Sequence, residues 1–323
     1  MPPVQAEPQQ VKRDAARKGR AFTQYAAAEP QQSRKQEAVI KQATLESSRS
    51  GRGLAPLLIF MKTFVVGDIH GRCAQLLNLL DMLAREPDEP LVFLGDLIDR
   101  GPDIPGCVEH VIKLCREDPD HVICLRGNHE QMLLDFIDRT GAIWMTPATG
   151  SERTFEQYTG QALRVEKESD FDEVRELLVK SIPPEQIEFF RSLPFFHEDD
   201  HALYVHAGLD HGKHPRESSP HDLMWSRDME FYKKYRGKPC VFGHTPTPLL
   251  PWRGRWGRHG IYLFNSAIGI DTGYNLQSPL TCLSLPDFTL YQTFADGNSA
   301  THQITSFIPE TLKEMQRKAA AGS

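Results

Sequence analysis

Five short apolar segments of this 323-residue sequence are each followed directly by residues that commonly bind metal ions. The first runs into Gly-Asp-Ile-His-Gly, the second into Gly-Asp-Leu-Ile-Asp-Arg-Gly and the third into Gly-Asn-His-Glu. Two later segments run into His-Ala-Gly and Gly-His-Thr. A mixture of carboxylates and imidazoles suits borderline divalent cations such as Mn²⁺, Fe or Zn²⁺ better than Ca²⁺ or Mg²⁺. The predicted metal ligands are Asp68, His70, Asp96, Asn128, His206 and His244.

Two neighbouring cations require a ligand that both can share. A carboxylate can do this because each of its oxygens can bind one cation. Asp96 is the best candidate, since it lies on the middle of the first three loops. Any one of these motifs is weak evidence by itself, but five segment ends with metal-type ligands are hard to obtain by chance.

The elements that must position these side chains alternate between strand and helix. Apolar runs predict strands at 62–67, 91–95 and 121–127, and amphipathic patterns predict helices at 72–85, 104–116 and 130–138. This order indicates parallel strands with right-handed crossovers. Because the carboxyl ends of parallel strands meet at one edge of a sheet, the polar loops are expected to converge there.

The second half of the chain has a different pattern. Residues 140–200 are predicted to be mainly helical and polar, with one helix beginning at Pro183 and Pro184. Short apolar runs after residue 200 predict a second sheet whose last hairpin turns at Pro286 and Asp287. The strands expected in that sheet are 202–205, 240–243, 261–264, 280–285 and 288–294.

Composition narrows the class of protein. Hydrophobic residues make up 40% and charged residues 25%, as in ordinary globular enzymes, and the net charge of -6 does not favour nucleic acid or membrane surfaces as partners. No apolar run approaches the roughly 20 residues that span a bilayer. The six cysteines lack CxxC spacing and sit mostly in apolar runs, which indicates buried thiols in a reducing compartment. We therefore expect a cytoplasmic enzyme, and no pattern indicates an oligomeric state.

Residues 1–55 differ from the rest of the chain. They are basic, rich in Gln, Ala and Ser, and poor in large apolar side chains, so we expect a disordered or loosely ordered tail. An organellar targeting peptide, or a translation start at Met61, are the alternatives. The expected organisation is a catalytic domain at 56–310 with a helical insert at about 140–200, followed by a C-terminal tail at 311–323.

The motifs together resemble the signature of the calcineurin-type metallophosphoesterases. The resemblance covers residues 62–290 and includes Asp68-x-His70, Gly95-Asp96-x-x-Asp99-Arg100 and Gly127-Asn128-His129-Glu130. Within that family, the last two motifs and Trp225-Ser226-Arg227 are similar to the phosphoprotein phosphatases, especially the small bacterial and phage Ser/Thr enzymes. The implied fold is α/β, with two mixed β-sheets packed face to face and helices outside.

The resemblance also implies roles for the ligands. Asp68, His70 and Asp96 would hold one cation, and Asp96 with Asn128, His206 and His244 would hold the other. Two such cations, ~3.5–4 Å apart, can lower the pKa of a bridging water and produce hydroxide for in-line attack on phosphorus. Mn²⁺ is the expected metal, with Fe or Zn²⁺ as alternatives.

Four further residues are expected to act on the substrate. His129 can protonate the leaving alkoxide, and Asp99 can orient its imidazole. Arg100 offers a planar fork that fits phosphate oxygens, and Arg227 is the predicted second phosphate contact. A surface ion pair is the structural alternative for both arginines.

The predicted activity is hydrolysis of phosphate monoesters, with phosphoserine and phosphothreonine proteins as preferred substrates over other small phosphoesters. The alternative is a symmetrical diadenosine tetraphosphatase, which the chain also resembles in its first two motifs and in Asp271-Thr272-Gly273. Glu130 favours the protein phosphatase, because the dinucleotide enzymes usually have Asp there. Cations and indoles interleaved over 251–259 favour the alternative, since they can hold a base. A non-catalytic metal-binding scaffold is disfavoured because no ligand is missing.

Overall fold

The computed structural model describes residues 61–251, 260–273, 275–305 and 308–321, and it contains two sheets. The predicted first strand lies inside the larger sheet. Three parallel strands form one half of this sheet, and two crossover helices connect them, as the sequence predicts. The strands are β1 (Thr63–Val66), β2 (Leu91–Phe93) and β3 (Val122–Cys124), and the helices are α3 (Cys73–Met82) and α4 (Ile104–Glu117). The side-chain oxygen of Asp103 caps the amino end of α4 by accepting from Gly106 N.

The other half of the larger sheet corrects the sequence prediction. Strands 280–285 and 288–294 were expected in the second sheet, yet β9 (Leu280–Leu285) pairs antiparallel with β1. Beyond it, β10 (Thr289–Thr293) and β11 (Ser299–Gln303) extend the sheet, also antiparallel. The error arises because β1 has two edges to pair, and local patterns do not reveal which distant strand fills the second one.

The smaller sheet has the order β4-β5-β6-β8-β7. Strands β5, β6 and β8 are parallel to one another, while β4 and β7 run antiparallel at the edges. The predicted strands near 202–205, 240–243 and 261–264 are present, whereas β4 and β8 were not predicted. Their bounds are β4 (Phe196–Glu198), β5 (Leu203–Val205), β6 (Cys240–Phe242), β7 (Tyr262–Phe264) and β8 (Ala267–Gly269).

Alternating side chains divide the core into layers. In β1, Phe64 and Val66 pack with the helices on the outer face, whereas Val65 joins the cluster that fills the space between the sheets. In the second sheet, Tyr204 and Val241 belong to that same central cluster, and the alternate residues of their strands pack outward. The fold is therefore the predicted α/β arrangement of two mixed sheets packed face to face with helices outside.

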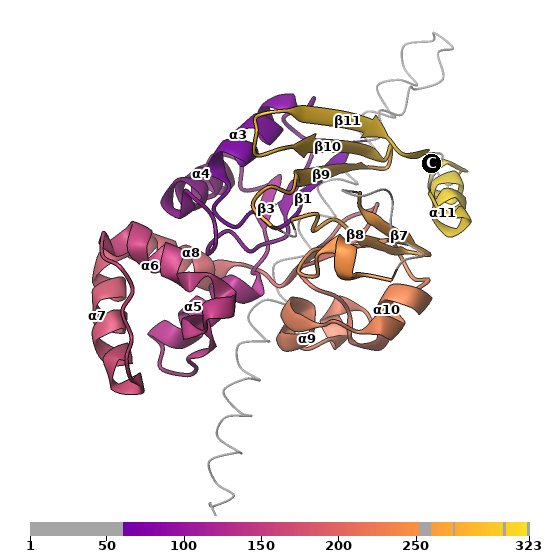
Figure 1. Cartoon of the computed structure of the whole chain (residues 1–323). Helices are drawn as coiled ribbons and strands as arrows, with labels where there is room; N and C mark the ends of the chain where they lie inside the picture. The colour runs from indigo at the N-terminus through magenta and orange to yellow at the C-terminus, as the bar shows by residue number, and fades with distance from the viewer. Residues whose placement is uncertain (1–60, 252–259, 274, 306–307, 322–323) are drawn as a thin grey trace, which may run out of the picture. The chain divides into compact units, whose positions relative to one another are not determined.

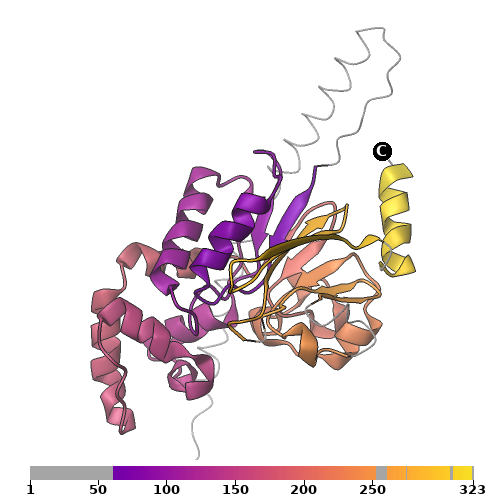
Figure 2. The same cartoon turned by 45° about the horizontal axis from the view of Figure 1, so that its top comes forward.

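Helices α3 and α4 pack against the larger sheet, and two further groups of helices lie beside them and on the smaller sheet (Figure 1). The first group is α5 (Asn128–Ile137), α6 (Ser151–Thr159), α7 (Phe171–Ser181) and α8 (Pro184–Ser192), the last three within 140–200. The second sheet carries α9 (Pro220–Trp225) and α10 (Met229–Lys234) on its outer face. Residues expected as the C-terminal tail contain α11 (Glu310–Ala321), which lies at the opposite end from α6 and α7 in both views (Figures 1 and 2).

All described residues belong to one unit, Phe60–Ser323. The predictions for residues 1–55 lie outside the described ranges. Within those ranges, no helix combines the length and apolar composition that crossing a bilayer requires. Five of the six cysteines are buried and Cys115 is half-buried, in agreement with their prediction as small core side chains.

Candidate active site

The six predicted metal ligands come together at the carboxyl ends of five strands. Asp68 and His70 follow β1, Asp96 follows β2 and Asn128 follows β3. His206 and His244 follow the parallel strands β5 and β6 of the second sheet. All six side chains are buried. The site therefore lies where the two sheets meet.

Asp96 is at the centre of this site. Its Oδ2 lies 3.5 Å from His70 Nε2, and its Oδ1 lies 3.5 Å from His206 Nε2. Atoms that could bind a metal form two groups, each within 4.8 Å, that share Asp96: one with His70 and His129, the other with His206 and His244. Among the described residues, the predicted ligand Asp68 belongs to neither group, whereas the predicted acid His129 belongs to one. One carboxylate thus turns a different oxygen toward each group, as a ligand shared by two cations must.

The second group closes around Asn128. Its Oδ1 lies 2.9 Å from His206 Nε2 and 2.7 Å from His244 Nδ1. His206 donates its Nδ1–H to the Leu94 carbonyl at 2.7 Å, so Nε2 carries a lone pair toward the Asn128 oxygen. Two lone pairs facing each other at hydrogen-bond distance repel, and a cation bound to both atoms would remove the repulsion. His244 Nε2 is buried without a hydrogen-bond partner among the described residues.

His70 is held in the same way. Its Nδ1–H donates to the Ile98 carbonyl at 2.9 Å, which fixes the tautomer and leaves Nε2 as the free ligand atom. Burial, together with Arg100 and His129, lowers the pKa of His70 well below its ordinary value. Burial and His206 likewise lower the pKa of His244 well below the ordinary value. Neutral imidazoles with available lone pairs are what metal binding requires.

The pKa values of the two carboxylates, Asp68 and Asp96, shift in opposite directions. Burial, with Asp271 and Asp96 nearby, raises the pKa of Asp68 well above its ordinary value. Burial also opposes the ionisation of Asp96, but the imidazoles of His206, His129 and His70 outweigh it and lower the pKa. Acidic groups gathered in a buried site need positive charge to ionise together. These donors fit two divalent cations.

Glycines let the carboxylates approach the backbone. A Cβ on Gly243 would lie 2.1 Å from Asp68 Oδ1, and one on Gly127 would lie 2.1 Å from Asp96 Oδ1. The Asp68 carboxylate instead accepts from the backbone N–H of His244 at 3.1 and 3.0 Å. No side chain fits at these two glycine positions without moving a predicted ligand.

Several residues of the site have a strained backbone conformation. Five predicted site residues have positive φ: His70, Asp96, Asp99, Arg100 and His244. Each such residue costs of order 1–3 kcal/mol and persists only where surrounding contacts hold it. The surrounding structure therefore stabilises a site geometry that these segments would not adopt alone.

The predicted acid and its partner are joined by a short contact. His129 Nδ1–H donates to Asp99 Oδ2 at 2.6 Å, which leaves Nε2 directed at Asp96 and Arg100. Burial alone would lower the pKa of His129, but Asp96 and Asp99 raise it above the ordinary value. His129 thus has a fixed ring orientation and a favoured protonated form.

Both predicted phosphate-binding arginines reach this region. Arg100 Nη1 lies 2.7 Å from His70 Nε2, and its Nη2 lies 3.0 Å from His129 Nε2. Arg100 therefore places a cationic group at the His70 lone pair. Arg227 Nη1 lies 3.5 Å from the hydroxyl of Thr245, the residue after His244. Tyr232 Oη also contacts that hydroxyl, at 3.0 Å.

Two buried residues that position the site were missed by sequence reasoning in that role. The Glu130 carboxylate accepts from four backbone N–H groups, those of Asp96, Leu97, Ile98 and Gly127, and so joins the second and third loops. The Arg72 guanidinium donates to the carbonyls of Asp68 and Ile69 at 2.6 and 2.9 Å, and to those of Ser278 and Pro279. Sequence patterns do not show that these two charged side chains are buried, and their burial is what indicates a positioning role.

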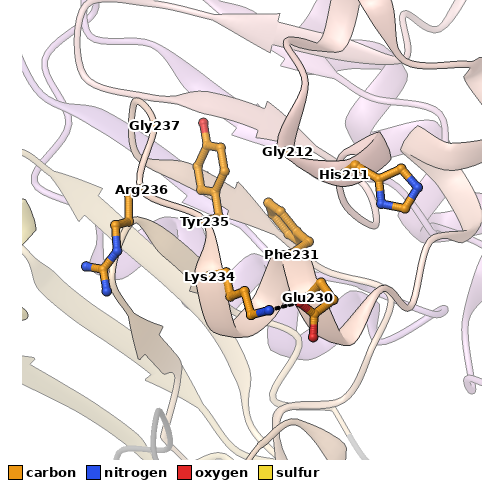
Figure 3. A pocket seen from close by; sticks show the side chains of 8 residues that line it. All are labelled: His211, Gly212, Glu230, Phe231, Lys234, Tyr235, Arg236 and Gly237. Atoms are coloured by element: carbon orange, nitrogen blue, oxygen red, sulfur yellow. Dashed lines mark ion pairs between the residues drawn. The ribbon is translucent and has the colours of Figure 1, made fainter.

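Other predicted features fall at or away from this site. Asp271 is buried and acts electrostatically on Asp68. The Trp/Arg stretch at 252–259 lies outside the described residues. None of the metal-type ligands lines a pocket of about 490 Å³ beside α10 (Figure 3). Its lining residues are His211, Gly212, Glu230, Phe231, Lys234, Tyr235, Arg236 and Gly237.

Comparisons with known proteins point to one family. A family model described as calcineurin-like phosphoesterase matches residues 61–268. A symmetrical bis(5'-nucleosyl)-tetraphosphatase of Janthinobacterium sp. (strain Marseille) is 23% identical over 295 residues, covering 72% of this chain and 96% of that protein. Serine/threonine-protein phosphatase 1 of Salmonella typhimurium is 48% identical over 73 residues, which cover 22% of this chain and 31% of that protein.

A solved metallophosphoesterase from Sphaerobacter thermophilus is similar at 17% identity with a TM-score of 0.43, covering 78% of this chain and 97% of that one.

Proposed function

Because the chain belongs to the calcineurin-like phosphoesterase family, we propose that it hydrolyses phosphate monoesters with two divalent cations, Mn²⁺ being preferred. The preferred substrates are proteins that carry phosphoserine or phosphothreonine. The observation that carries this proposal is Asp96, whose two oxygens face two separate groups of ligand atoms. When bound there, two cations would neutralise charge on a phosphate and lower the pKa of a nucleophilic water.

Proton transfer falls to His129. Its Nδ1–H is bonded to Asp99, so the proton for the leaving group must come from Nε2. The Nε2 atom faces the site between Asp96 and Arg100. The carboxylates of Asp96 and Asp99 raise the pKa of His129 above its ordinary value, which favours the protonated ring that a general acid requires.

Phosphate binding falls to the two arginines. Arg100 extends over His70 and His129, where its paired N–H groups can meet two phosphate oxygens. Arg227 approaches from the second sheet beside Thr245 and His244. A phosphate bound to Arg100 would lie close to His129, which Arg100 contacts. Arg100 must release His70 Nε2 when a cation binds that atom. It must also release His129 Nε2 when that atom carries a proton, because a guanidinium group only donates.

The choice of a protein substrate is supported by the 48% identity to the Salmonella phosphatase over 73 residues. It is also supported by Glu130 after His129, as in the phosphoprotein phosphatase motif. The alternative, symmetrical diadenosine tetraphosphate hydrolysis, is supported by the match to the Janthinobacterium enzyme over 96% of that protein.

A direct comparison separates the two candidates. The full chain, freed of metal with EDTA and reloaded with Mn²⁺, should release phosphate from a phosphothreonine peptide with a higher kcat/KM than from diadenosine tetraphosphate. A higher value for the dinucleotide, with ADP as product, would establish the alternative. The His129→Asn variant should turn over phenyl phosphate roughly 10²–10⁴-fold more slowly than the wild type, the span expected for loss of a general acid. Unchanged turnover in that variant would remove His129 from the mechanism.

A further inference from the structure

The helices inserted at 140–200 contribute side chains to the buried face of Asp99. Asp99 is fully buried, and its carboxylate has three side-chain partners. One is His129, and the other two come from the insert. Thr154 Oγ1 on α6 donates to Asp99 Oδ1 at 2.5 Å, and Trp144 Nε1 in the short 3-10 helix Ile143–Met145 lies 3.2 Å from both carboxylate oxygens.

Thr154 binds Asp99 at two points. Its hydroxyl donates to the carboxylate and also accepts from the backbone N–H of Asp99 at 3.0 Å. Both functions of one hydroxyl are therefore used on one residue. Rotation of the Asp99 side chain would break both the Thr154 and the His129 bonds, so the hydroxyl locks the carboxylate in the orientation that His129 requires.

The insert also holds the strained backbone beside Asp99. Asp99 and Arg100 have φ of 69° and 68°, the left-handed region that non-glycine residues avoid. The Arg100 N–H donates to the Gly150 carbonyl at 3.0 Å. A Cβ on Gly150 would lie 2.6 Å from Arg100 Cγ, so the turn packs directly against the Arg100 side chain. Gln157 on α6 adds a bond to the Gly101 carbonyl at 2.9 Å.

We propose that Thr154 and Trp144 are positioning residues, which set proton delivery by His129 through their hydrogen bonds to Asp99. This inference rests on the proposed role of His129 as general acid. The insert then supports the second loop, and it reaches His129 through Asp99. A purely structural role would affect folding, whereas a positioning role also changes how strongly the rate depends on the leaving group.

The test uses the leaving group as its readout. Phenol leaves with difficulty and needs a proton, whereas p-nitrophenol leaves readily and needs little help. In the Mn²⁺-loaded full chain, Thr154→Val should lower kcat on phenyl phosphate roughly tenfold, the span of one lost hydrogen bond to a charged group. The loss on p-nitrophenyl phosphate should be much smaller. Thr154→Ser, which keeps the hydroxyl, should restore the phenyl phosphate rate.

A matched control lies on the same helix. The Thr159 hydroxyl donates to the Phe155 carbonyl at 2.7 Å, away from Asp99, so Thr159→Val should leave both rates unchanged. In an Asp99→Asn background, Thr154→Val should cause no additional loss, because residues that act as one unit are not additive. If Thr154→Val does not fold, Trp144→Phe gives the same test, since it keeps a ring beside Phe136.

Three results would overturn the inference: equal losses on the two substrates, an unchanged phenyl phosphate rate in Thr154→Val, or full additivity with Asp99→Asn. His129→Asn, measured in parallel, distinguishes the two levels. If that variant shows no leaving-group dependence beyond the wild type, the proposed role of His129 as general acid fails. If it does and Thr154→Val does not, only the positioning role fails.

Discussion

Glu130→Gln should loosen the link between the second and third loops. Glu130 Oε1 accepts from Leu97 and Ile98 at 2.7 and 3.4 Å, and Oε2 accepts from Asp96 and Gly127 at 3.0 and 2.9 Å. Glutamine keeps one oxygen but directs an N–H₂ group at the two N–H donors of the other. Two hydrogen bonds to a charged group contribute roughly 1.5–3 kcal/mol each.

An opposing effect reduces this figure. Burial and the Asp96 carboxylate raise the pKa of Glu130 to about 7, so the charge itself is costly and the neutral amide avoids that cost. We therefore take the lower end, about 3 kcal/mol in the free energy of unfolding. For a domain of this size that corresponds to a fall in Tm of roughly 6–12 °C.

Urea unfolding in EDTA at pH 8 measures this difference without bound metal. Glu188→Gln is the matched control, because the Glu188 side chain is 76% exposed and lies 3.7 Å from Arg191. That change should alter stability by less than about 0.5 kcal/mol. Calorimetric titration with Mn²⁺ should then show roughly 10–100-fold weaker binding to Glu130→Gln, as is usual when a partner of a metal ligand is lost. Wild-type stability together with wild-type affinity would refute the reasoning.

Asp96→Asn should abolish the binding of both cations, because Asp96 belongs to both ligand groups, whereas His206→Ala should remove only one cation. The stoichiometry of Mn²⁺ binding, measured by calorimetry, checks this. Equal stoichiometry in the two variants would contradict a shared ligand. Arg100→Lys should raise KM for p-nitrophenyl phosphate roughly tenfold, since an ammonium lacks the planar pair of N–H groups; an unchanged KM would exclude Arg100 from phosphate binding. Asp118→Asn should cost up to about 1 kcal/mol of stability near pH 7. Burial opposes ionisation of Asp118, but Arg85 and His121 lower its pKa below the ordinary 3.8, so the difference from wild type is present above that pH and is lost as the pH falls through the folded-state pKa. Urea midpoints between pH 2 and 7 follow this loss, and a difference that persists at pH 2 would assign it to packing.

Local patterns were sufficient for the strands and helices that carry the site. Each predicted ligand follows a short apolar run, and alternation with amphipathic helices implies parallel strands whose ends meet. These patterns therefore predict that Asp68, Asp96 and Asn128 lie at one edge of a sheet. The convergence of His206 and His244 from a second sheet rested on their similar setting after apolar strands and on the family resemblance.

Pairing between distant segments was beyond the same reasoning. Strand β9 pairs with β1 so that Leu283 lies opposite Val65, and both side chains belong to the cluster between the sheets. The apolar pattern of each strand does not show which distant strand it pairs with. Thr154 and Trp144 were missed for a related reason. They lie in a polar helical segment with no strand-end signal, and their importance comes from a buried carboxylate contributed by another part of the chain.

The antiparallel pairing of β1 with β9 has a consequence for synthesis. While the chain leaves the ribosome, β1 can join β2 and β3 early, but its other edge stays open until residues 280–285 have emerged. An open strand edge is a template for pairing with other chains, and contacts between such distant segments form slowly. The nascent protein therefore passes through a stage in which the strand that leads to Asp68 has one edge open to pairing with other chains.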